Sequence, residues 1–261
     1  MRRYAKQIFR CRALFYICFF VAIQYIPPSK CFASLERNYL NQNCFTRNIF
    51  YNNLELFKIA KSELGFSLPK REVEVYYSLF REHGRQLGLA STASISEKGF
   101  EKLFLESVLI LKEFSPPQGA TVLDLGSGAG FPAICLKIVR FDLNFILLES
   151  NHKKFLFLEK MEKVLGLSGL EVLEKRSEDF AREGRTFDFV TARAFGPLDK
   201  FAKTAYPFMH LNSLAVAVKA SDFSREISAL KKFPKVVFIG AKEVKFKKAK
   251  YQIALAFLKK A

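Results

Sequence analysis

The chain has 261 residues, and its 42 Lys and Arg residues outnumber its 25 Asp and Glu residues, which gives a formal net charge of +17 at pH 7. This length is enough for one large domain or two small ones, and five cysteines without a Cys-x-x-Cys pair argue against a disulfide framework and a cysteine metal site. The charge excess predicts a polyanionic partner, first a nucleic acid and second an anionic membrane surface.

Residues 1–53 differ in composition from everything that follows. The first twelve residues carry five basic side chains and no acidic one, and an apolar run over 13–26 comes next. As a helix this run would be about 21 Å long, whereas the hydrocarbon core of a membrane is about 30 Å thick. Three explanations stay open: a cleaved targeting peptide, an anchor on the membrane surface, or translated sequence upstream of a misassigned start.

A small helical cap is predicted next, because apolar residues recur there at helical spacing. The pattern favours helices over 54–64, from Pro69 and from Glu97, with a loop of small polar residues over 91–96. Two consecutive prolines then end the helical pattern and mark a boundary. The predicted organisation is an N-terminal extension of residues 1–53, a cap of residues 54–116 and a cofactor domain of residues 117–261.

The cofactor domain alternates between strand and helix patterns. Strands are predicted over 121–125, 144–149, 170–175, 187–192, 214–219, 235–240 and 251–257, and helices over 132–140, 151–165, 197–210 and 222–232. Such alternation is typical of a Rossmann-like, doubly wound and mostly parallel sheet. The last two strands leave no room for a helix between them, so they should form an antiparallel edge hairpin. Cys135 falls in the first of these helices, where a buried thiol is expected.

Three glycines alternate directly after the first of these strands, in the phrase ATVLDLGSGAGFP of residues 120–132. A dinucleotide-binding turn would need its third glycine at the position of Phe131. The observed spacing of Gly126, Gly128 and Gly130 instead favours an S-adenosylmethionine site, and a glycine turn without a ligand is the alternative.

Several side chains should meet at the carboxyl edge of the sheet, where open α/β sheets bind ligands. Asp124 ends the first strand, and Glu149 ends the second, where it could bind ribose hydroxyls or cap the next helix. Ser177 and Glu178, together with the following aspartate, could contact an adenine edge or cap a helix. Phe131 could line the cofactor pocket or pack under the turn.

Basic side chains supply a second group of candidates. Arg193 ends the fourth strand with no acid beside it in the sequence, so its guanidinium could bind a phosphate, a carboxylate or a nucleobase edge, or lie solvated on the surface. Lys219, at the end of the fifth strand, has the same alternatives. The run 242–250 places five lysines around Phe246 in the predicted hairpin, where it could bind a phosphate backbone or guard a sheet edge.

Five phrases together carry a family resemblance: VLDLGSGAGFPAICLKI, LLESNHKKFLFLEKMEKVLGL, RSEDF, FDFVTARAFGPLDKFAKTAYPFM and LAVAVKA. They resemble the bacterial 16S ribosomal RNA guanine-N7 methyltransferases, the glucose-inhibited division protein B family, over residues 54–260. The resemblance implies a class I methyltransferase fold and S-adenosylmethionine as cofactor. It also implies 16S rRNA or the small ribosomal subunit as partner, no metal, a monomer and a cytoplasmic location, which favours the misassigned start among the three explanations for residues 1–53.

Carried over residue by residue, the resemblance implies the cofactor-site residues Gly126, Phe131, Ser177, Glu178 and Arg193, with Glu149 beside them, and the glycine turn adds Gly128. Glu149 stands in place of an acid that is usually one carbon shorter. In the cap, Leu103 stands where the family's histidine is expected and Glu106 where its aspartate is expected. The alternatives are therefore a methyltransferase for a small molecule or protein and a non-catalytic RNA-binding or ribosome-binding relative. No catalytic acid or base is assigned, because N7 of neutral guanine carries a lone pair and no proton.

Overall fold

The computed structural model describes residues 55–219, 223–231, 233–246 and 252–261. The chain divides into two units, residues 1–52 and 53–261. The predictions made for residues 1–53 and for the lysines after Phe246 in the basic run fall outside the described residues. Among the residues that are described, no helix is both long enough and apolar enough to cross a membrane.

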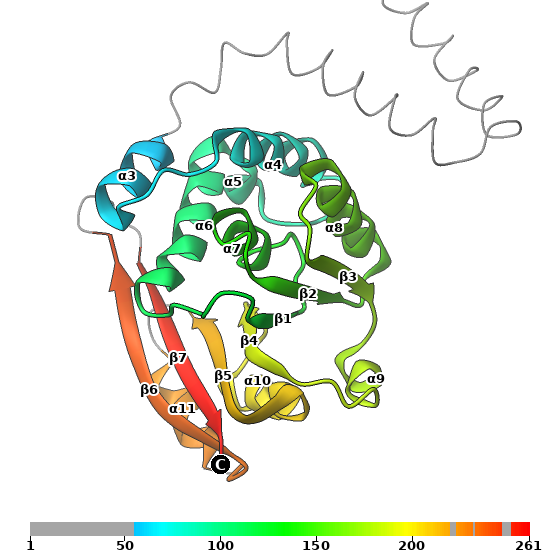
Figure 1. The fold of residues 1–261 in the computed structure, drawn as a ribbon, viewed down its shortest axis with the longest axis vertical. Helices are drawn as coiled ribbons and strands as arrows, with labels where there is room; N and C mark the ends of the chain where they lie inside the picture. Colours follow the sequence, from blue (N-terminus) through cyan, green and yellow to red (C-terminus); the bar gives the residue numbers. More distant parts are fainter. Residues whose placement is uncertain (1–54, 220–222, 232, 247–251) are drawn as a thin grey trace, which may run out of the picture. The chain divides into compact units, whose positions relative to one another are not determined.

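The centre of the fold is a seven-stranded sheet in the order β3-β2-β1-β4-β5-β7-β6 (Figure 1). Its strands are β1 Thr121–Leu125, β2 Asn144–Glu149, β3 Leu170–Glu174, β4 Phe187–Arg193, β5 Met209–Lys219, β6 Val236–Lys245 and β7 Gln252–Lys260. All neighbouring pairs are parallel except those of β7, which runs antiparallel to both β5 and β6. The predicted mostly parallel sheet with an antiparallel edge hairpin is confirmed.

Helices follow the parallel strands and cover both faces of the sheet (Figure 1). They are α7 Ala133–Val139, α8 His152–Leu165, α9 Ser177–Ala181, α10 Leu198–Ala205 and α11 Ser224–Leu230. The side chain of Asn151 caps α8 by accepting from the amide of Lys154, and Gly166 ends α8 with a left-handed conformation. The helix predicted over 197–210 was too long, because a 3-10 turn containing Pro207 follows α10 and β5 already begins at Met209.

The N-terminal helices pack over one face of this sheet as α3 Glu55–Leu64, α4 Lys70–His83, α5 Thr92–Ile95, α6 Glu97–Leu109 and the 3-10 helix Ile110–Lys112. The three predicted helices are present. The loop expected over 91–96 was wrong in part, because it contains the one-turn helix α5. The Ser91 side chain accepts from the amide of Ser94, and the Ser96 side chain accepts from that of Gly99, so two hydroxyls cap consecutive helices.

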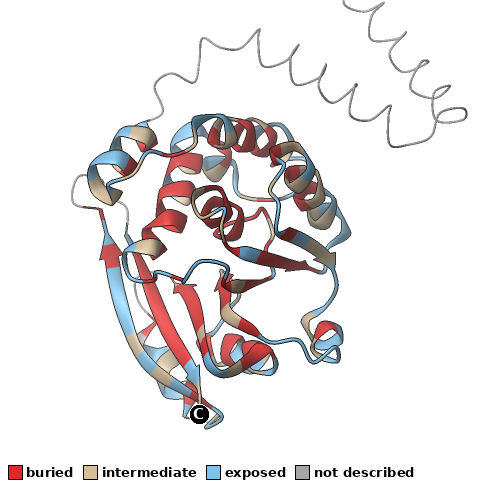
Figure 2. Ribbon diagram, in the orientation of Figure 1, coloured by how far each residue is buried: buried red, intermediate tan, exposed pale blue. Residues whose placement is uncertain are grey.

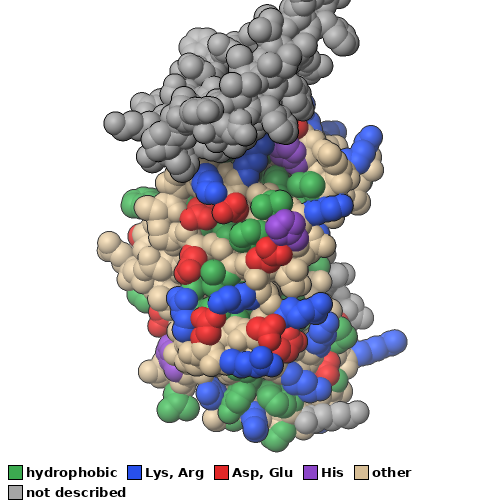
Figure 3. Space-filling view, turned by 90° about the vertical axis from the view of Figure 1, so that its right-hand side faces the viewer, with side chains coloured by type: hydrophobic (Ala, Val, Ile, Leu, Met, Phe, Trp, Pro, Cys, Tyr) green, Lys and Arg blue, Asp and Glu red, His purple; other side chains and the backbone are tan. Residues whose placement is uncertain are grey.

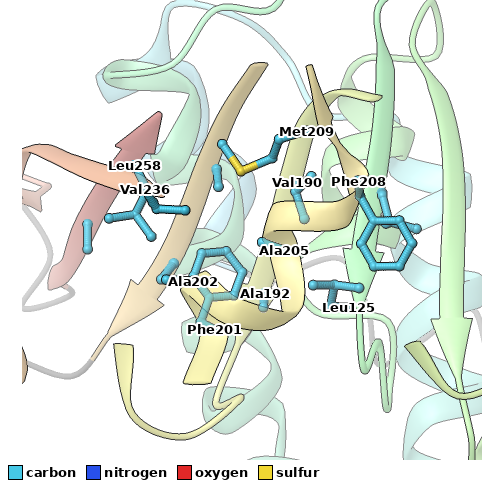
Figure 4. Close-up of a cluster of buried hydrophobic side chains, with 14 of the residues drawn as sticks. Leu125, Val190, Ala192, Phe201, Ala202, Ala205, Phe208, Met209, Val236 and Leu258 are labelled. Atoms are coloured by element: carbon cyan, nitrogen blue, oxygen red, sulfur yellow. The ribbon is translucent and has the colours of Figure 1, made fainter. Parts of the chain in front are cut away.

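Two cores hold the layers together. On one face, α10 presents Phe201, Ala202 and Ala205 to strand residues such as Val190 and Leu258 (Figure 4). Burial extends along β5 and β7, whereas the edge strand β6 is largely exposed (Figure 2). On the other face, Tyr76, Phe80, Phe100 and Phe104 of α4 and α6 are fully buried. Phenylalanine thus fills both cores, which are the main source of stability.

Candidate functional site

The glycine turn follows β1 at the carboxyl edge of the sheet. Gly126, Gly128 and Gly130 have φ values of +67°, +59° and +94°, a conformation that side-chain-bearing residues rarely adopt. The amides of Gly126 and Ser127 both donate to the carbonyl of Leu148 in β2, at 2.8 and 3.1 Å. The three alternating glycines therefore allow the backbone to turn across the carboxyl end of β1 and β2.

Close packing adds a second reason for glycine at position 130. A Cβ atom there would lie 2.5 Å from Cδ1 of Ile134 and 3.1 Å from the hydroxyl of Tyr76. That hydroxyl donates to the carbonyl of Ala129 at 2.7 Å, so α4 of the cap holds the turn directly. The geometry of the turn thus depends on the cap as well as on the strands.

Glu149 lies at the end of β2 and faces the turn. One carboxylate oxygen accepts from the amide of Gly128 and the other from the amide of Asn151, both at 2.8 Å. The residue is 7% exposed, and each oxygen keeps a further lone pair. The carboxylate therefore fixes the glycine turn and still has acceptor capacity for hydroxyl groups of a ligand.

Asp124, at the end of β1, is 1% exposed. Its Oδ1 accepts from the hydroxyl of Thr191 in β4 at 2.8 Å, whereas its Oδ2 has no hydrogen-bond partner among the described residues. Burial raises the pKa of this carboxyl from 3.8 to about 7; the hydroxyls of Ser127 and Thr191 oppose the rise, and the nearby Glu149 charge adds to it. A buried acceptor without a partner is costly, so this oxygen indicates a ligand.

We expect the raised pKa of Asp124 to make the unliganded protein less stable as pH rises. Below about pH 4 the Asp124 carboxyl is protonated in both the folded and the unfolded protein. Between about pH 4 and pH 7 only the folded protein retains this proton. The free energy of unfolding therefore falls by roughly 1.4 kcal/mol per pH unit in this range. Denaturant unfolding of wild type and Asp124→Asn between about pH 5 and pH 8 checks this. The difference between the two proteins should change with pH, and a constant difference would contradict the assignment.

Arg193 ends β4, two residues beyond Thr191. Its Nη2 donates to Oε2 of Glu106 in α6 at 2.6 Å, and Glu106 is 5% exposed. The sequence-based view that no acid neighbours this arginine was wrong, because the acid comes from the cap, 87 positions earlier. Nη1 of Arg193 is buried and has no partner among the described residues. Position 106 had been noted only as a departure from the family pattern.

Comparisons with known proteins identify the family and the fold of the chain. The family model GidB, rRNA small subunit methyltransferase G, matches residues 70–255. The chain belongs to this family. Proteins named ribosomal RNA small subunit methyltransferase G from Caldanaerobacter subterraneus subsp. tengcongensis and Lactococcus lactis subsp. lactis are 35% and 31% identical to it. These matches cover 65% and 72% of this chain and 73% and 81% of the relatives.

Solved structures show the same fold at low sequence identity. A mutant of MtNAS in complex with S-adenosylmethionine has a TM-score of 0.51 at 14% identity, covering 74% of this chain and 76% of that one. MtNAS in complex with MTA and tNA has a TM-score of 0.50 at 13% identity, covering 88% and 98%. The predicted class I methyltransferase fold is thereby confirmed, as is the predicted family.

The two unpartnered atoms fit the cofactor that is expected of this family. Asp124 Oδ2 is an acceptor and Arg193 Nη1 is a donor, and they are the two buried side-chain polar atoms without a partner in the described part of the chain. They belong to the ends of the neighbouring strands β1 and β4. The methionine part of S-adenosylmethionine carries an ammonium and a carboxylate, which require one acceptor site and one donor site.

Other predicted residues lie around this centre. Ser177 and Glu178 begin α9 after β3, at the same edge of the sheet, and Glu178 is exposed. Phe131 is 8% exposed and its ring stacks on Tyr76 with centroids 5.2 Å apart, so it packs against the cap. Cys135 is fully buried, as predicted, and burial raises the pKa of its thiol.

Two of the candidate cations, Lys219 and Lys242, have structural partners. Lys219 Nζ donates to Glu226 at 2.6 Å and to the carbonyl of Gly196 at 2.8 Å, which ties β5 to α11 and to the loop after β4. Lys242 pairs with Glu113. The expectation that Phe246 lies among lysines on the surface was wrong. Its ring is only 2% exposed and lies beneath Lys112. The view in Figure 3 likewise shows Lys and Arg interspersed with Asp and Glu.

A metal site is not indicated by the described residues, which contain no group of three or more His, Cys, Asp or Glu side chains placed to hold an ion. The acids at the carboxyl edge have other contacts. Glu149 binds two backbone amides and Glu106 binds Arg193. Their arrangement suits an organic cofactor with hydroxyl, ammonium and carboxylate groups.

Proposed function

We propose that this protein transfers the methyl group of S-adenosylmethionine to N7 of a guanine in 16S ribosomal RNA. Family membership supports methylation of small-subunit ribosomal RNA with this cofactor. The observation that carries the site assignment is the pair of buried, unpartnered atoms of opposite character on Asp124 and Arg193. The choice of N7 rests on the resemblance noted in the sequence and on the chemistry of the site.

Each residue has a defined task in binding. We assign the cofactor's ammonium to Asp124, its carboxylate to Arg193 and its ribose hydroxyls to Glu149. Ser177 and Glu178, at the end of the next strand, are assigned to the adenine edge. The glycine turn allows the backbone to approach the ligand without Cβ atoms in the way.

The chemistry needs alignment rather than proton transfer. When bound, the cofactor supplies a methyl group on a positively charged sulfur. Guanine N7 has a free lone pair, so no side chain has to remove a proton, and none of the residues assigned above is a histidine or a cysteine. The protein acts by holding the groups in line and by excluding water from the carboxyl edge.

The polyanionic substrate fits the charge of the chain. Without residues 1–53, which contribute +7 of the net charge of +17, the chain still carries +10, and this excess favours association with RNA over most proteins and neutral small molecules. The proposal includes action in the cytoplasm, where ribosomal RNA and the cofactor are both present.

Methylation of small subunits tests the proposal directly. Small subunits from cells that lack this protein are incubated with the purified chain and methyl-labelled cofactor, and the RNA is digested to nucleosides. We expect label in N7-methylguanosine. Label in another nucleoside would overturn the N7 assignment. Label only in protein or small molecules would favour a methyltransferase that acts on those substrates. Cofactor binding without any methyl transfer would favour a non-catalytic protein that binds RNA or the ribosome.

A further inference from the structure

Glu106 connects the cap to the candidate cofactor site, because it lies in α6 and pairs with Arg193 of β4. It lies in the last two turns of α6, which packs against α7 directly after the glycine turn. Its Oε2 accepts from Arg193 at 2.6 Å, while its Oε1 is 3.9 Å from the ammonium of Lys102, a side chain that is 57% exposed. One carboxylate therefore contacts a partly buried cation on one side and an exposed cation on the other.

The ion pair between Glu106 and Arg193 leaves one buried donor of the guanidinium without an acceptor among the described residues. A buried pair seldom stabilises a fold more than apolar side chains of the same volume would, because both charges lose their hydration. That loss is offset when every donor finds an acceptor, yet Nη1 of Arg193 is buried and lacks one among the described residues. The pair thus leaves one guanidinium nitrogen available, in an orientation that Glu106 sets.

The backbone at Arg193 cannot set this orientation alone. Ala194, the next residue, has a φ of +54°, so the chain turns out of the sheet immediately after the arginine. Arg193 is itself the last paired residue of β4, opposite Val218 of β5, so the ordered strand ends at this side chain. Its only ion-pair partner among the described residues is Glu106.

We propose that Glu106 is a positioning residue of the cap: it fixes the Arg193 guanidinium so that Nη1 meets the carboxylate of the cofactor's methionine part. The proposal rests on the assignment of that carboxylate to Arg193 in the proposed function. It also makes cofactor affinity depend on the docking of α6, although no atom of the cap need touch the cofactor.

Two ligands distinguish positioning from a merely structural role. S-Adenosylhomocysteine has the carboxylate, whereas methylthioadenosine has the same nucleoside and thioether without the amino-acid part. Calorimetry on the full chain should show that Glu106→Gln raises the Kd for S-adenosylhomocysteine at least about tenfold, the value of a charge-assisted hydrogen bond. The Kd for methylthioadenosine should change by less than about twofold. Equal weakening for both ligands, or no weakening for either, would overturn the proposal.

Lys102→Ala is the matched control, because it removes the exposed partner of the same carboxylate and leaves the contact with Arg193 in place. It should leave both affinities within about twofold of wild type, as expected for an exposed pair. A loss as large as that of Glu106→Gln would mean that the charge of α6, and not the position of Arg193, is what matters.

A double variant keeps the test valid if Glu106→Gln does not fold. Glu106→Met combined with Arg193→Met replaces the buried pair by apolar side chains, which usually preserves stability. Because Glu106 is proposed to act through Arg193, the double variant should bind S-adenosylhomocysteine as weakly as Arg193→Met alone. Independent, additive losses would overturn the proposal. Binding is measured without RNA, so a protein that meets these expectations but methylates no ribosomal RNA would contradict only the proposed function.

Discussion

Replacing Arg193 with alanine should reduce methyl transfer to small ribosomal subunits by roughly ten- to a hundredfold. The variant loses a charge-assisted hydrogen bond to the cofactor, which contributes about 1.5–3 kcal/mol. It also leaves the buried carboxylate of Glu106 with only the exposed Lys102 as a cation, 3.9 Å away, which lowers the stability of the fold. The measurement is label incorporation into subunits from cells lacking the protein, with thermal unfolding recorded in parallel.

Arg193→Lys separates these two contributions. Lysine keeps a positive charge for Glu106 but cannot offer two donors in the fixed arrangement of a guanidinium. We expect most of the stability to return while the KM for the cofactor stays raised. If Arg193→Ala transfers methyl groups at the wild-type rate when the cofactor is limiting, Arg193 does not belong to the cofactor site.

Among alanine substitutions at the glycines of the turn, Gly130→Ala should lower the stability of the protein most. The left-handed backbone costs about 1–2 kcal/mol for a side-chain-bearing residue, and overpacking costs about 1–3 kcal/mol more. The new Cβ would approach Ile134 to 2.5 Å and the hydroxyl of Tyr76 to 3.1 Å. In a chain of this size the expected fall in Tm is roughly 5–15 °C.

Gly184→Ala is the control for the backbone contribution. Gly184 also has a left-handed conformation, with φ of +68°, but nothing lies within 4 Å of the position of its Cβ. Its alanine variant should therefore lose only about 2–4 °C. If both variants unfold at the same temperature, contact with the cap does not restrict the turn.

The parallel strands were predictable because burial on both faces produces short, continuous apolar runs. TVLDL and NFILLE were placed as β1 and β2 with the bounds that the structure has. The short helices α5 and α9, of four and five residues, were missed because they are too short to show a helical period. The first half of β5 was missed because the phrase HLNS is polar and joins the sheet beside an irregularity in its pairing with β4.

The arrangement of side chains at the carboxyl edge of the sheet was predictable where it follows from chain order. Asp124 and Glu149 lie in the last residues of β1 and β2 and the glycine turn follows β1, so their meeting point could be inferred from the strand pattern. The Glu106–Arg193 pair could not, because no local rule links a cap helix to β4 across 87 positions. Phe246 was misplaced for the same reason: its sequence neighbours are lysines, but tertiary packing of the hairpin against the 3-10 helix buries it.

The aromatic contact between cap and turn has a consequence for how a substrate enters. Tyr76, Phe80 and Phe100 pack around Phe131 with centroid distances between 5.2 and 6.1 Å. Swinging the cap open would expose these rings to water, at a cost on the order of several kcal/mol. We therefore expect a fixed entrance rather than a hinged lid. The rearrangement needed to expose a single guanine, including its unstacking from neighbouring bases, would then fall on the RNA.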